Sequence, residues 1–328
     1  MENNILIIGA GVAGLSAARV LQDQGRKVRV IDKGRGLGGR VATRRLGDTH
    51  QIRGRWDHGA QFATFRDPEI ISQLKEWDCW DLMKPWIPGH QNPNLFRQRP
   101  LEGMNAFAKA LAAGVEVHRS QQIENIEQLS GGWKLTTTTG QNFEAAHLIA
   151  TMPLPQFREL AKNSSLRLFP AEIEKIQSVR YHRCLTLLAE TDGPSGLDQP
   201  GFVQVQNGIL ETIIDQYQKG ISPGHTLVAN ATPSFSQEWF RRDRNVAASI
   251  LRASLQEQIQ SKILSVQIHG WKFAKATQRI HGNFLQLENG IYLAGDGFAA
   301  GNQLTAPELP ARIESAILSG ISAAKNLC

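Results

Sequence analysis

The feature that most limits how this chain can fold lies within its first fifteen residues. The apolar run Ile5–Ile8 is followed by Gly9, Gly11 and Gly14, which have the spacing GxGxxG. The run predicts a buried strand, and the residues from Leu15 onward predict a helix. The three glycines permit a tight turn, close approach of the backbone to a phosphate, and close packing of helix on strand. The segment therefore predicts a βα unit whose helix N-terminus binds a pyrophosphate.

A second apolar segment, residues 27–31, predicts the next strand and ends at Asp32. A carboxylate at this place in a dinucleotide-binding unit binds a ribose diol. The glycine-rich segment 34–40 comes next, and its Gly39 and Arg40 add close backbone approach and a positive charge. A nicotinamide dehydrogenase has no evident need of this second turn. The segment therefore indicates a larger cofactor whose pyrophosphate is enclosed from two sides.

The composition of the 328 residues is typical of a globular enzyme, with 41% hydrophobic and 20% charged residues. The length predicts two domains. No apolar run is long enough to span a bilayer, and the first residues lack the basic region of a signal peptide, so we expect a cytoplasmic protein. The three cysteines have no CxxC spacing, which predicts neither a disulfide framework nor a metal site.

The formal net charge of +6 raises the question of a nucleic-acid partner. Much of the charge is local, because many basic residues lie within residues 33–55, where a bound pyrophosphate is expected. Aromatic residues do not alternate with these arginines as they do in single-strand binders. We therefore expect no nucleic-acid partner. Arg44 and Arg45 fit a solvated basic face equally well.

The rest of the chain divides by its motifs into two domains. Residues 67–99 are rich in Trp and Pro, and residues 155–265 combine strands with a long helical stretch, 236–261, but have no glycine-rich phosphate loop. These two segments are predicted to form a substrate-binding domain. The cofactor-binding domain is predicted from residues 1–66, 100–154 and 266–328.

Four segments together resemble the flavin-binding set of the FAD-dependent amine oxidase superfamily. They are GxGxxG with Asp32, Gly38-Gly39-Arg40, the run Asp-His-Gly-Ala-Gln-Phe at 57–62, and Gly295-Asp296. Within that superfamily the chain is similar to the renalases, on the motifs Thr-Met-Pro-Leu-Pro at 151–155, Trp271-Lys272, and Gly-Asp-Gly-Phe at 295–298. The resemblance spans the whole chain.

The resemblance implies an α/β fold: a Rossmann-like FAD-binding domain of the glutathione reductase/amine oxidase type, with an interleaved α+β substrate domain. It implies a noncovalent FAD and no metal. It further requires Arg40, Gln61 and Asp296 to border one groove that leads away from the first glycine turn. The cofactor-binding residues implied in this way are Gly9, Gly11, Ala13, Gly14, Asp32, Lys33, Gly39, Arg40, Ala60, Gln61, Phe62, Ile123, Gly295, Asp296 and Ile313.

The activity that the resemblance implies is that of a renalase-like oxidase. Such enzymes take a hydride from aberrant dihydro isomers of NAD(P)H onto flavin N5 and pass the electrons to O2, giving NAD(P)+ and H2O2. With a single dinucleotide fingerprint in the chain, a pyridine nucleotide would enter the substrate cavity itself as a small-molecule substrate, and no membrane partner is expected. Two alternatives stay open: another flavin amine oxidase or desaturase, and a non-enzymatic escort protein of the same fold.

Candidate pocket residues follow the predicted strand 265–270: Trp271, Lys272 and Phe273. Lys272 fits a surface charge equally well, and Trp271 fits a core aromatic. His182 is a further pocket candidate, and it shares with His58 and His269 the ordinary pKa range of an acid or base at neutral pH. Structural roles for these histidines remain the alternative. The three tyrosines are scattered along the sequence, which disfavours the paired aromatic cage of a simple amine oxidase.

Overall fold

The computed structural model describes residues 4–47, 51–88, 95–301 and 312–327. At the centre of one lobe, the buried strand β1 (Ile5–Ile8) lies between two parallel neighbours, β2 (Val28–Ile31) and β11 (His147–Ala150). Further strands extend the sheet on both sides to the order β18-β19-β11-β1-β2-β7, and β18 pairs antiparallel with β19 at one edge. These outer strands are β7 (Glu116–His118), β19 (Tyr292–Leu293) and β18 (Leu285–Gln286).

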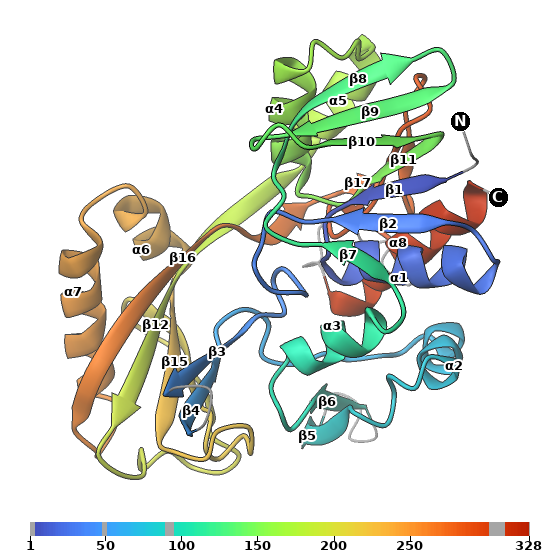
Figure 1. Ribbon diagram of the computed structural model, residues 1–328. Coiled ribbons are helices and arrows are strands. Elements are labelled where there is room, and N and C mark those ends of the chain that lie inside the picture. Colours follow the sequence, from blue (N-terminus) through green and yellow to red (C-terminus); the bar gives the residue numbers. More distant parts are fainter. Residues whose placement is uncertain (1–3, 48–50, 89–94, 302–311, 328) are drawn as a thin grey trace.

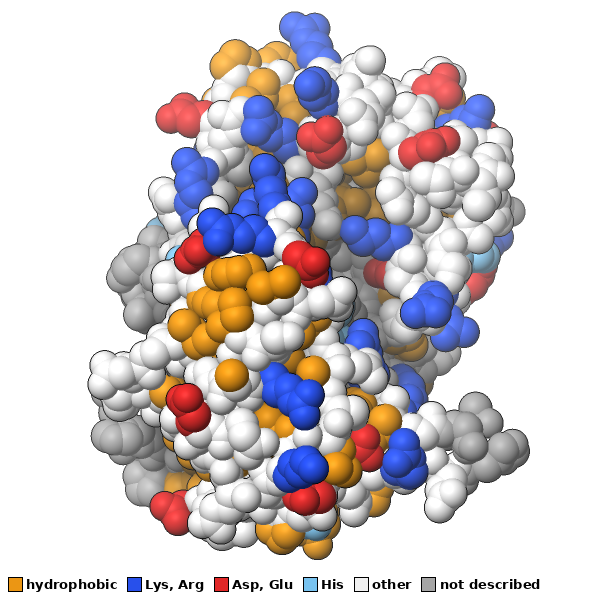
Figure 2. All heavy atoms as spheres, turned by 90° about the vertical axis from the view of Figure 1, so that its left-hand side faces the viewer, with side chains coloured by type: hydrophobic (Ala, Val, Ile, Leu, Met, Phe, Trp, Pro, Cys, Tyr) orange, Lys and Arg blue, Asp and Glu red, His pale blue; other side chains and the backbone are white. Residues whose placement is uncertain are grey.

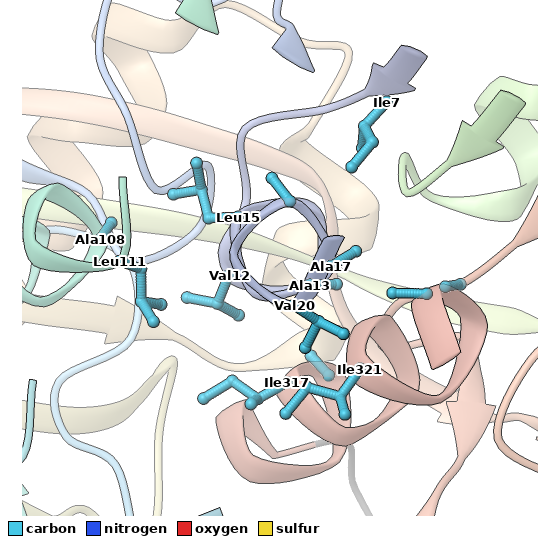
Figure 3. Packing of buried hydrophobic residues seen from close by; sticks show 14 of the residues in the cluster. Ile7, Val12, Ala13, Leu15, Ala17, Val20, Ala108, Leu111, Ile317 and Ile321 are labelled. Atoms are coloured by element: carbon cyan, nitrogen blue, oxygen red, sulfur yellow. The ribbon is translucent and has the colours of Figure 1, made fainter. Parts of the chain in front are cut away.

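Three helices cover one face of this sheet (Figure 1). Figure 3 shows Val20 of α1 (Val12–Asp23) directed toward Ile317 and Ile321 of α8 (Ile313–Asn326). The two helices lie close together because Gly320 has no side chain: a Cβ there would be 2.0 Å from the carbonyl oxygen of Ala13. The helices are α1 (Val12–Asp23), α3 (Asn105–Leu111) and α8 (Ile313–Asn326).

The opposite face of the sheet is covered by a three-stranded antiparallel sheet and two helices (Figure 1). Phe157 and Trp133 from these layers share one buried cluster with Leu6 of the central sheet. The elements are β8 (Ile123–Leu129), β9 (Gly132–Thr137), β10 (Asn142–Ala145), α4 (Leu154–Asn163) and α5 (Pro170–Ser178).

The second lobe is built on a five-stranded antiparallel sheet with the order β13-β14-β15-β12-β16. Its two longest strands, β12 and β16, pair along most of their length and run from this lobe up to the first one (Figure 1). Because β12 follows α5 of the first lobe directly, this strand is one of the places where the chain passes between the lobes. The strands are β12 (Arg180–Thr191), β13 (Phe202–Gln204), β14 (Leu210–Asp215), β15 (Thr226–Ala231) and β16 (Ile263–Gln278).

One face of the second sheet packs against α6 (Pro233–Trp239) and α7 (Arg244–Gln256). The other face packs against a hairpin of β3 (Thr43–Gly47) and β4 (Ile52–Asp57). The indole of Trp56 is fully buried there and donates to the carbonyl oxygen of Ala189. The hairpin therefore carries the chain from the second glycine turn into the second lobe and back.

The smaller elements lie at the edges of these layers. Buried residues between 65 and 83 join the core of the first lobe, and β5 pairs with β6. The bounds are α2 (Pro68–Glu76), β5 (Lys84–Pro88), β6 (Phe96–Arg99), β17 (Ile280–His281) and β20 (Phe298–Ala299).

The predicted fold class is confirmed, with differences in detail. The first helix begins at Val12 rather than near Leu15, with Gly11 as its N-cap. The predicted helical stretch 236–261 is two helices, because the chain leaves the helix at Phe240 and Asp243 starts a new one by accepting from backbone N–H groups.

The predicted domain boundaries stay a prediction. Two segments assigned by sequence to the substrate domain pack with the first lobe: buried residues of 67–83 join its helical layer, and buried residues of 155–179 join the opposite face. No helix within the described ranges is both long and apolar enough to cross a bilayer.

A fully buried ion pair joins the two lobes near the end of the β3–β4 hairpin. Lys219 Nζ lies 2.7 Å from Asp57 Oδ2, and neither side chain is exposed to solvent. Asp57 Oδ1 also accepts from the Thr43 hydroxyl at 2.5 Å and from the backbone N–H of Met104 at 2.8 Å. Lys219 donates in addition to Gln61 Oε1 at 3.1 Å. Burial lowers the pKa of Lys219, and the charge of Asp57 opposes that effect.

Lys219→Met is expected to lower the free energy of unfolding by about 3–5 kcal/mol, because it leaves the Asp57 carboxylate buried without its cation. Arg242→Gln is the matched control. It breaks an exposed pair with Glu238 and is expected to cost less than about 1 kcal/mol. Urea unfolding of the two variants measures both values, and equal losses would contradict the role given to the buried pair.

Candidate functional site

A cleft of about 1450 Å³ runs along the carboxyl ends of the central strands. It is lined by both glycine turns, by residues 269–275 of β16 and by the start of α8. Small-ligand sites usually measure about 300–1,000 Å³. The cleft therefore has room for a large cofactor together with a substrate, at the place where sheets of this kind bind nucleotides.

The first glycine turn forms an open cradle at the N-terminus of α1. Gly9 has φ +112°, which favours glycine, and a Cβ on Gly14 would lie 1.9 Å from the Gly9 carbonyl oxygen. At Gly11, in contrast, a Cβ would meet no protein atom within 4 Å. Gly11 is also an N-cap without a side-chain hydrogen bond to the helix. Free backbone N–H groups and the positive end of the helix dipole thus face empty space, which suits a pyrophosphate.

Asp32 ties the first glycine turn to the second. Its Oδ2 accepts from the backbone N–H of Ala10 and its Oδ1 from that of Gly34, both at 2.6 Å. Gly38 then pairs with Gly11 in an isolated parallel bridge, and its N–H donates to the Ala10 carbonyl oxygen at 2.8 Å. Burial raises the pKa of Asp32, and the two backbone hydrogen bonds work against that rise. The carboxylate still lines the cleft, where a ribose can reach it.

Arg40 connects the second glycine turn to the end of the chain. Its guanidinium forms a two-pronged hydrogen bond with Asp296, in which Nη2 lies 2.6 Å from Oδ1 and Nη1 contacts Oδ2. The Tyr181 hydroxyl donates to the same Oδ1 at 3.4 Å, and its ring lies beneath the guanidinium. Two motifs 256 residues apart in sequence therefore meet at one wall of the cleft.

Most of the residues predicted from the sequence line this one cleft. They are Gly9, Gly11, Ala13, Asp32, Lys33, Gly39, Arg40, Ala60, Ile123, Trp271, Lys272, Phe273, Gly295, Asp296 and Ile313.

Four predicted residues do not line the cleft. Gly14 lies behind the turn, where it contacts Gly9. The Gln61 side chain points into the buried Lys219 network, so Arg40 and Asp296 border the expected groove without it, and Ala60 lines the cleft instead. Phe62 packs against Trp86 and Phe202. His182 lies on β12 with an exposed side chain.

The sequence reasoning missed Thr151 and Tyr181. Thr151 lines the cleft, and its hydroxyl lies 3.1 Å from the carbonyl oxygens of both Ile8 and Gly9, which share its one hydrogen and so hold the first turn from behind. Its place in the Thr-Met-Pro motif was the available signal. No sequence pattern predicts a role for Tyr181, because nothing in the sequence indicates that it lies beside Asp296.

Three aromatic side chains form a cluster at the β16 wall of the cleft. The ring of His58 lies 4.8 Å from that of His269 and 5.5 Å from that of Trp271, and the Trp271 indole donates to the His58 carbonyl oxygen at 2.7 Å. His269 and Trp271 line the cleft. Burial, followed by the charges of His269 and Arg44, lowers the pKa of His58 to about 4. At neutral pH His58 is therefore uncharged, which makes it a poor proton donor.

Together, the two glycine turns, the carboxylate at the end of β2 and the late Gly-Asp turn define an oxidoreductase of the kind that binds an extended flavin dinucleotide. Comparisons with known proteins agree. A family model described as flavin containing amine oxidoreductase matches residues 81–328, and one described as NAD(P)-binding Rossmann-like domain matches residues 7–77.

Individual relatives show the same pattern. Renalase of Mus musculus is 22% identical over 336 residues, covering 92% of this chain and 94% of renalase. L-amino-acid oxidase of Siganus canaliculatus is 51% identical over 44 residues, 13% of this chain and 8% of that protein. A solved structure named provisionally as a protoporphyrinogen oxidase, from Exiguobacterium sp. 255-15, superposes with a TM-score of 0.74 at 12% identity, covering 99% of this chain and 98% of that one.

The first family model spans most of the chain, so the protein belongs to the flavin-containing amine oxidoreductase family. The predictions of a flavoprotein oxidoreductase with similarity to renalase are confirmed. The escort-protein alternative is not supported, because the family to which the chain belongs is one of oxidoreductases.

Gly11→Ala is expected to weaken FAD binding at least about tenfold, because its methyl group would enter the cleft, while the cofactor-free protein keeps its melting temperature. Gly14→Ala is expected to lower that melting temperature, since its Cβ would collide with the turn. Gly193→Ala, whose Cβ meets open space far from the turn in sequence, is the control. Thermal melts and FAD titration measure these effects, and normal FAD affinity in Gly11→Ala would contradict the placement of the cofactor.

The free energy of unfolding is expected to rise by about 3 kcal/mol between pH 4 and pH 6.5 on account of His58 alone. Its pKa in the folded protein is about 4, below the value of 6.5 for an exposed histidine, so the unfolded chain binds more protons in this window. The contribution is complete above pH 6.5 and is lost as the pH falls toward 4. Urea unfolding of the parent and of His58→Phe across this range tests it, and identical pH slopes in the two proteins would contradict it.

Proposed function

We propose that this chain is a renalase-like oxidase that takes a hydride from aberrant dihydro isomers of NAD(P)H and passes the electrons to O2, giving NAD(P)+ and H2O2. The proposal includes a noncovalent FAD as the cofactor. Bound FAD would supply the two-electron acceptor, while the protein binds and orients the reactants. Similarity to renalase over nearly the whole chain supports the proposal.

The observation that carries the choice of substrate is the charge of the cleft beside β16. Lys272 and Lys275 line this part, and the segment 269–275 contains no carboxylate. Figure 2 shows Lys and Arg side chains around the hollow between the two lobes. Positive charge here attracts the phosphates of a dinucleotide and repels an ammonium group. An anionic pyridine nucleotide therefore suits the cleft better than a cationic amine.

The residues proposed to hold FAD divide into three groups. The backbone at Gly11 and Ala13 would bind the pyrophosphate, and Asp32 the adenosine ribose. Arg40 orients Asp296 through their ion pair, which would present the carboxylate to the ribityl hydroxyls. The N-terminus of α8 enters the cleft near Ile313, and its dipole favours negative charge on a reduced flavin ring.

Noncovalent binding is consistent with the cysteines. Neither Cys79 nor Cys184 lines the cleft, and burial raises the pKa of both thiols to about 11, which leaves them un-ionised and poorly nucleophilic. Hydride transfer from a dihydropyridine needs no protein base, because the ring nitrogen lone pair activates the donor carbon. This agrees with the cluster at the β16 wall, where His58, which stacks on the lining residue Trp271, is uncharged at neutral pH and weakly basic.

The second candidate is oxidation of an amine, which the family name favours. Oxidation of an amine by hydride transfer requires its uncharged form, so an amine that is cationic in solution would have to lose a proton before binding in the basic cleft, and its apparent affinity would be lower. The described lining of the cleft contains no pair of tyrosines that could enclose the amine.

Anaerobic mixing of the enzyme with 2- or 6-dihydro-NAD(P) isomers is expected to bleach the flavin rapidly, and amines are expected to bleach it slowly or not at all. Readmission of O2 should then yield one H2O2 for each dihydro isomer consumed. Ordinary 4-dihydro-NAD(P)H serves as the control of equal charge. Rapid bleaching by amines alone would remove the renalase-like assignment.

A further inference from the structure

The buried pair of Lys219 and Asp57 lies directly behind one wall of the cleft. Lys219 Nζ contacts Asp57 Oδ2 at 2.7 Å, and Asp57 Oδ1 accepts from the hydroxyl of Thr43 at 2.5 Å. The same hydroxyl accepts from the backbone N–H of Asn105 at 3.1 Å. Thr43 and Asn105 both line the cleft. Two successive hydrogen bonds therefore join the ammonium group to a side chain of the cleft wall.

The amide of Gln61 links the same ammonium group to the backbone of the cleft wall. Its Oε1 accepts from Lys219 Nζ and from the Gln216 amide, each at 3.1 Å. Its Nε2 donates to the carbonyl oxygen of Asp57. The Gln61 side chain therefore folds back over its own segment and holds the shape of that segment. Ala60, which lies within this segment, lines the cleft.

The backbone of this segment is bonded in turn to the segment that carries Arg40. The N–H of Ala60 donates to the carbonyl oxygen of Arg40 at 2.8 Å, and the N–H of His58 donates to that of Ala42 at 3.1 Å. Arg40 also lines the cleft, where it forms the ion pair with Asp296. A shift of residues 57–61 would therefore move Arg40 and its partner as well.

The charge of Lys219 is what keeps the Asp57 carboxylate in place as an acceptor. Lys219 follows β14 in the second lobe, and among the described residues it is the only ion-pair partner of Asp57. A carboxylate that is fully buried without a cation takes up a proton or draws in water. Either change weakens the acceptor to which the Thr43 hydroxyl and the Met104 N–H donate.

We propose that Lys219 is a positioning residue for the bound FAD, and that it acts through Asp57 on the wall of the cleft. The wall residues that it holds in place are Thr43, Ala60 and Arg40. Lys219 does not itself line the cleft, so the second lobe influences the affinity for the cofactor without touching it. The inference rests on the FAD of the proposed function and is independent of the choice of substrate.

Two substitutions of Thr43 test the link between the buried pair and the cleft. Thr43→Val removes the hydroxyl at nearly constant size and is expected to raise the Kd of FAD about tenfold. It should also shift the visible absorption bands of the bound flavin, because these bands respond to the surroundings of the ring. Thr43→Ser keeps the hydroxyl and is expected to recover most of the affinity and the parent spectrum. Titration of the cofactor-free proteins with FAD measures both. An unchanged Kd in Thr43→Val, or an equal loss in Thr43→Ser, would overturn the inference.

A double-mutant cycle tests the role of Lys219. Lys219→Met is expected to raise the Kd of FAD about tenfold, and adding Thr43→Val should raise it no further, because both substitutions act through Asp57. Leu251→Ala is the control: it removes a fully buried side chain of α7 that does not line the cleft. It destabilises the fold but is expected to change the Kd by less than about twofold. Additive effects, an equal effect of Leu251→Ala, or a Lys219→Met protein that does not fold in excess FAD would overturn the inference.

The positioning role and the proposed substrate can fail separately. Rapid bleaching of the flavin by amines alone would remove the renalase-like assignment, while the changes in the Kd of FAD would still support the role of Lys219. Rapid bleaching by dihydro isomers, together with an unchanged Kd of FAD in Lys219→Met, would overturn that role and leave the assignment standing. A parent protein that binds no FAD would overturn both.

Discussion

The carboxylate of Asp32 is the constraint on which the cofactor side of the structure depends. It accepts backbone N–H groups from both glycine turns at 2.6 Å, and so fixes the distance between them. That distance leaves Gly11 facing open space and lets Gly38 pair with it. The second turn then places Arg40 beside Asp296, with which it forms an ion pair. The other contacts depend on these hydrogen bonds of Asp32, because a shift of either turn would close the space at Gly11 or separate Arg40 from Asp296.

Local motifs predicted most of the described lining of the cleft from sequence alone. GxGxxG, the strand that ends at Asp32 and the late Gly-Asp turn are short-range patterns with a mechanism, and the residues that they predict line one cleft. Gln61 and Phe62 belong to the run at 57–62 and were predicted to bind the cofactor, but their side chains point away from the cleft. Their partners Lys219 and Phe202 lie far along the chain, so the sequence contained no sign of these contacts. No local pattern specifies a pairing between residues 57 and 219. The break at Phe240 was missed for a related reason: the apolar spacing continues across it, and only the cap at Asp243 marks the second helix.

The charged groups at the two ends of the cleft, near the glycine turns and near β16, differ in how they are paired. Near the glycine turns, two of the lining carboxylates are engaged: Asp32 by backbone donors and Asp296 by Arg40. Near β16, no carboxylate among the described residues forms an ion pair with Lys272 or Lys275, and burial lowers the pKa of both His58 and His269. The proposed oxidation of a neutral ring to a cation would need orientation more than a base, and the paired strands β12 and β16 would hold the two ends of the cleft together.

The most direct test of the account is the identity and amount of flavin in the purified protein. If the convergent turns enclose one extended dinucleotide, denaturation should release one FAD for each chain into solution, free of the polypeptide. A colourless protein that takes up no FAD would contradict the account, because the cradle at Gly11 would then have been assigned to the wrong ligand.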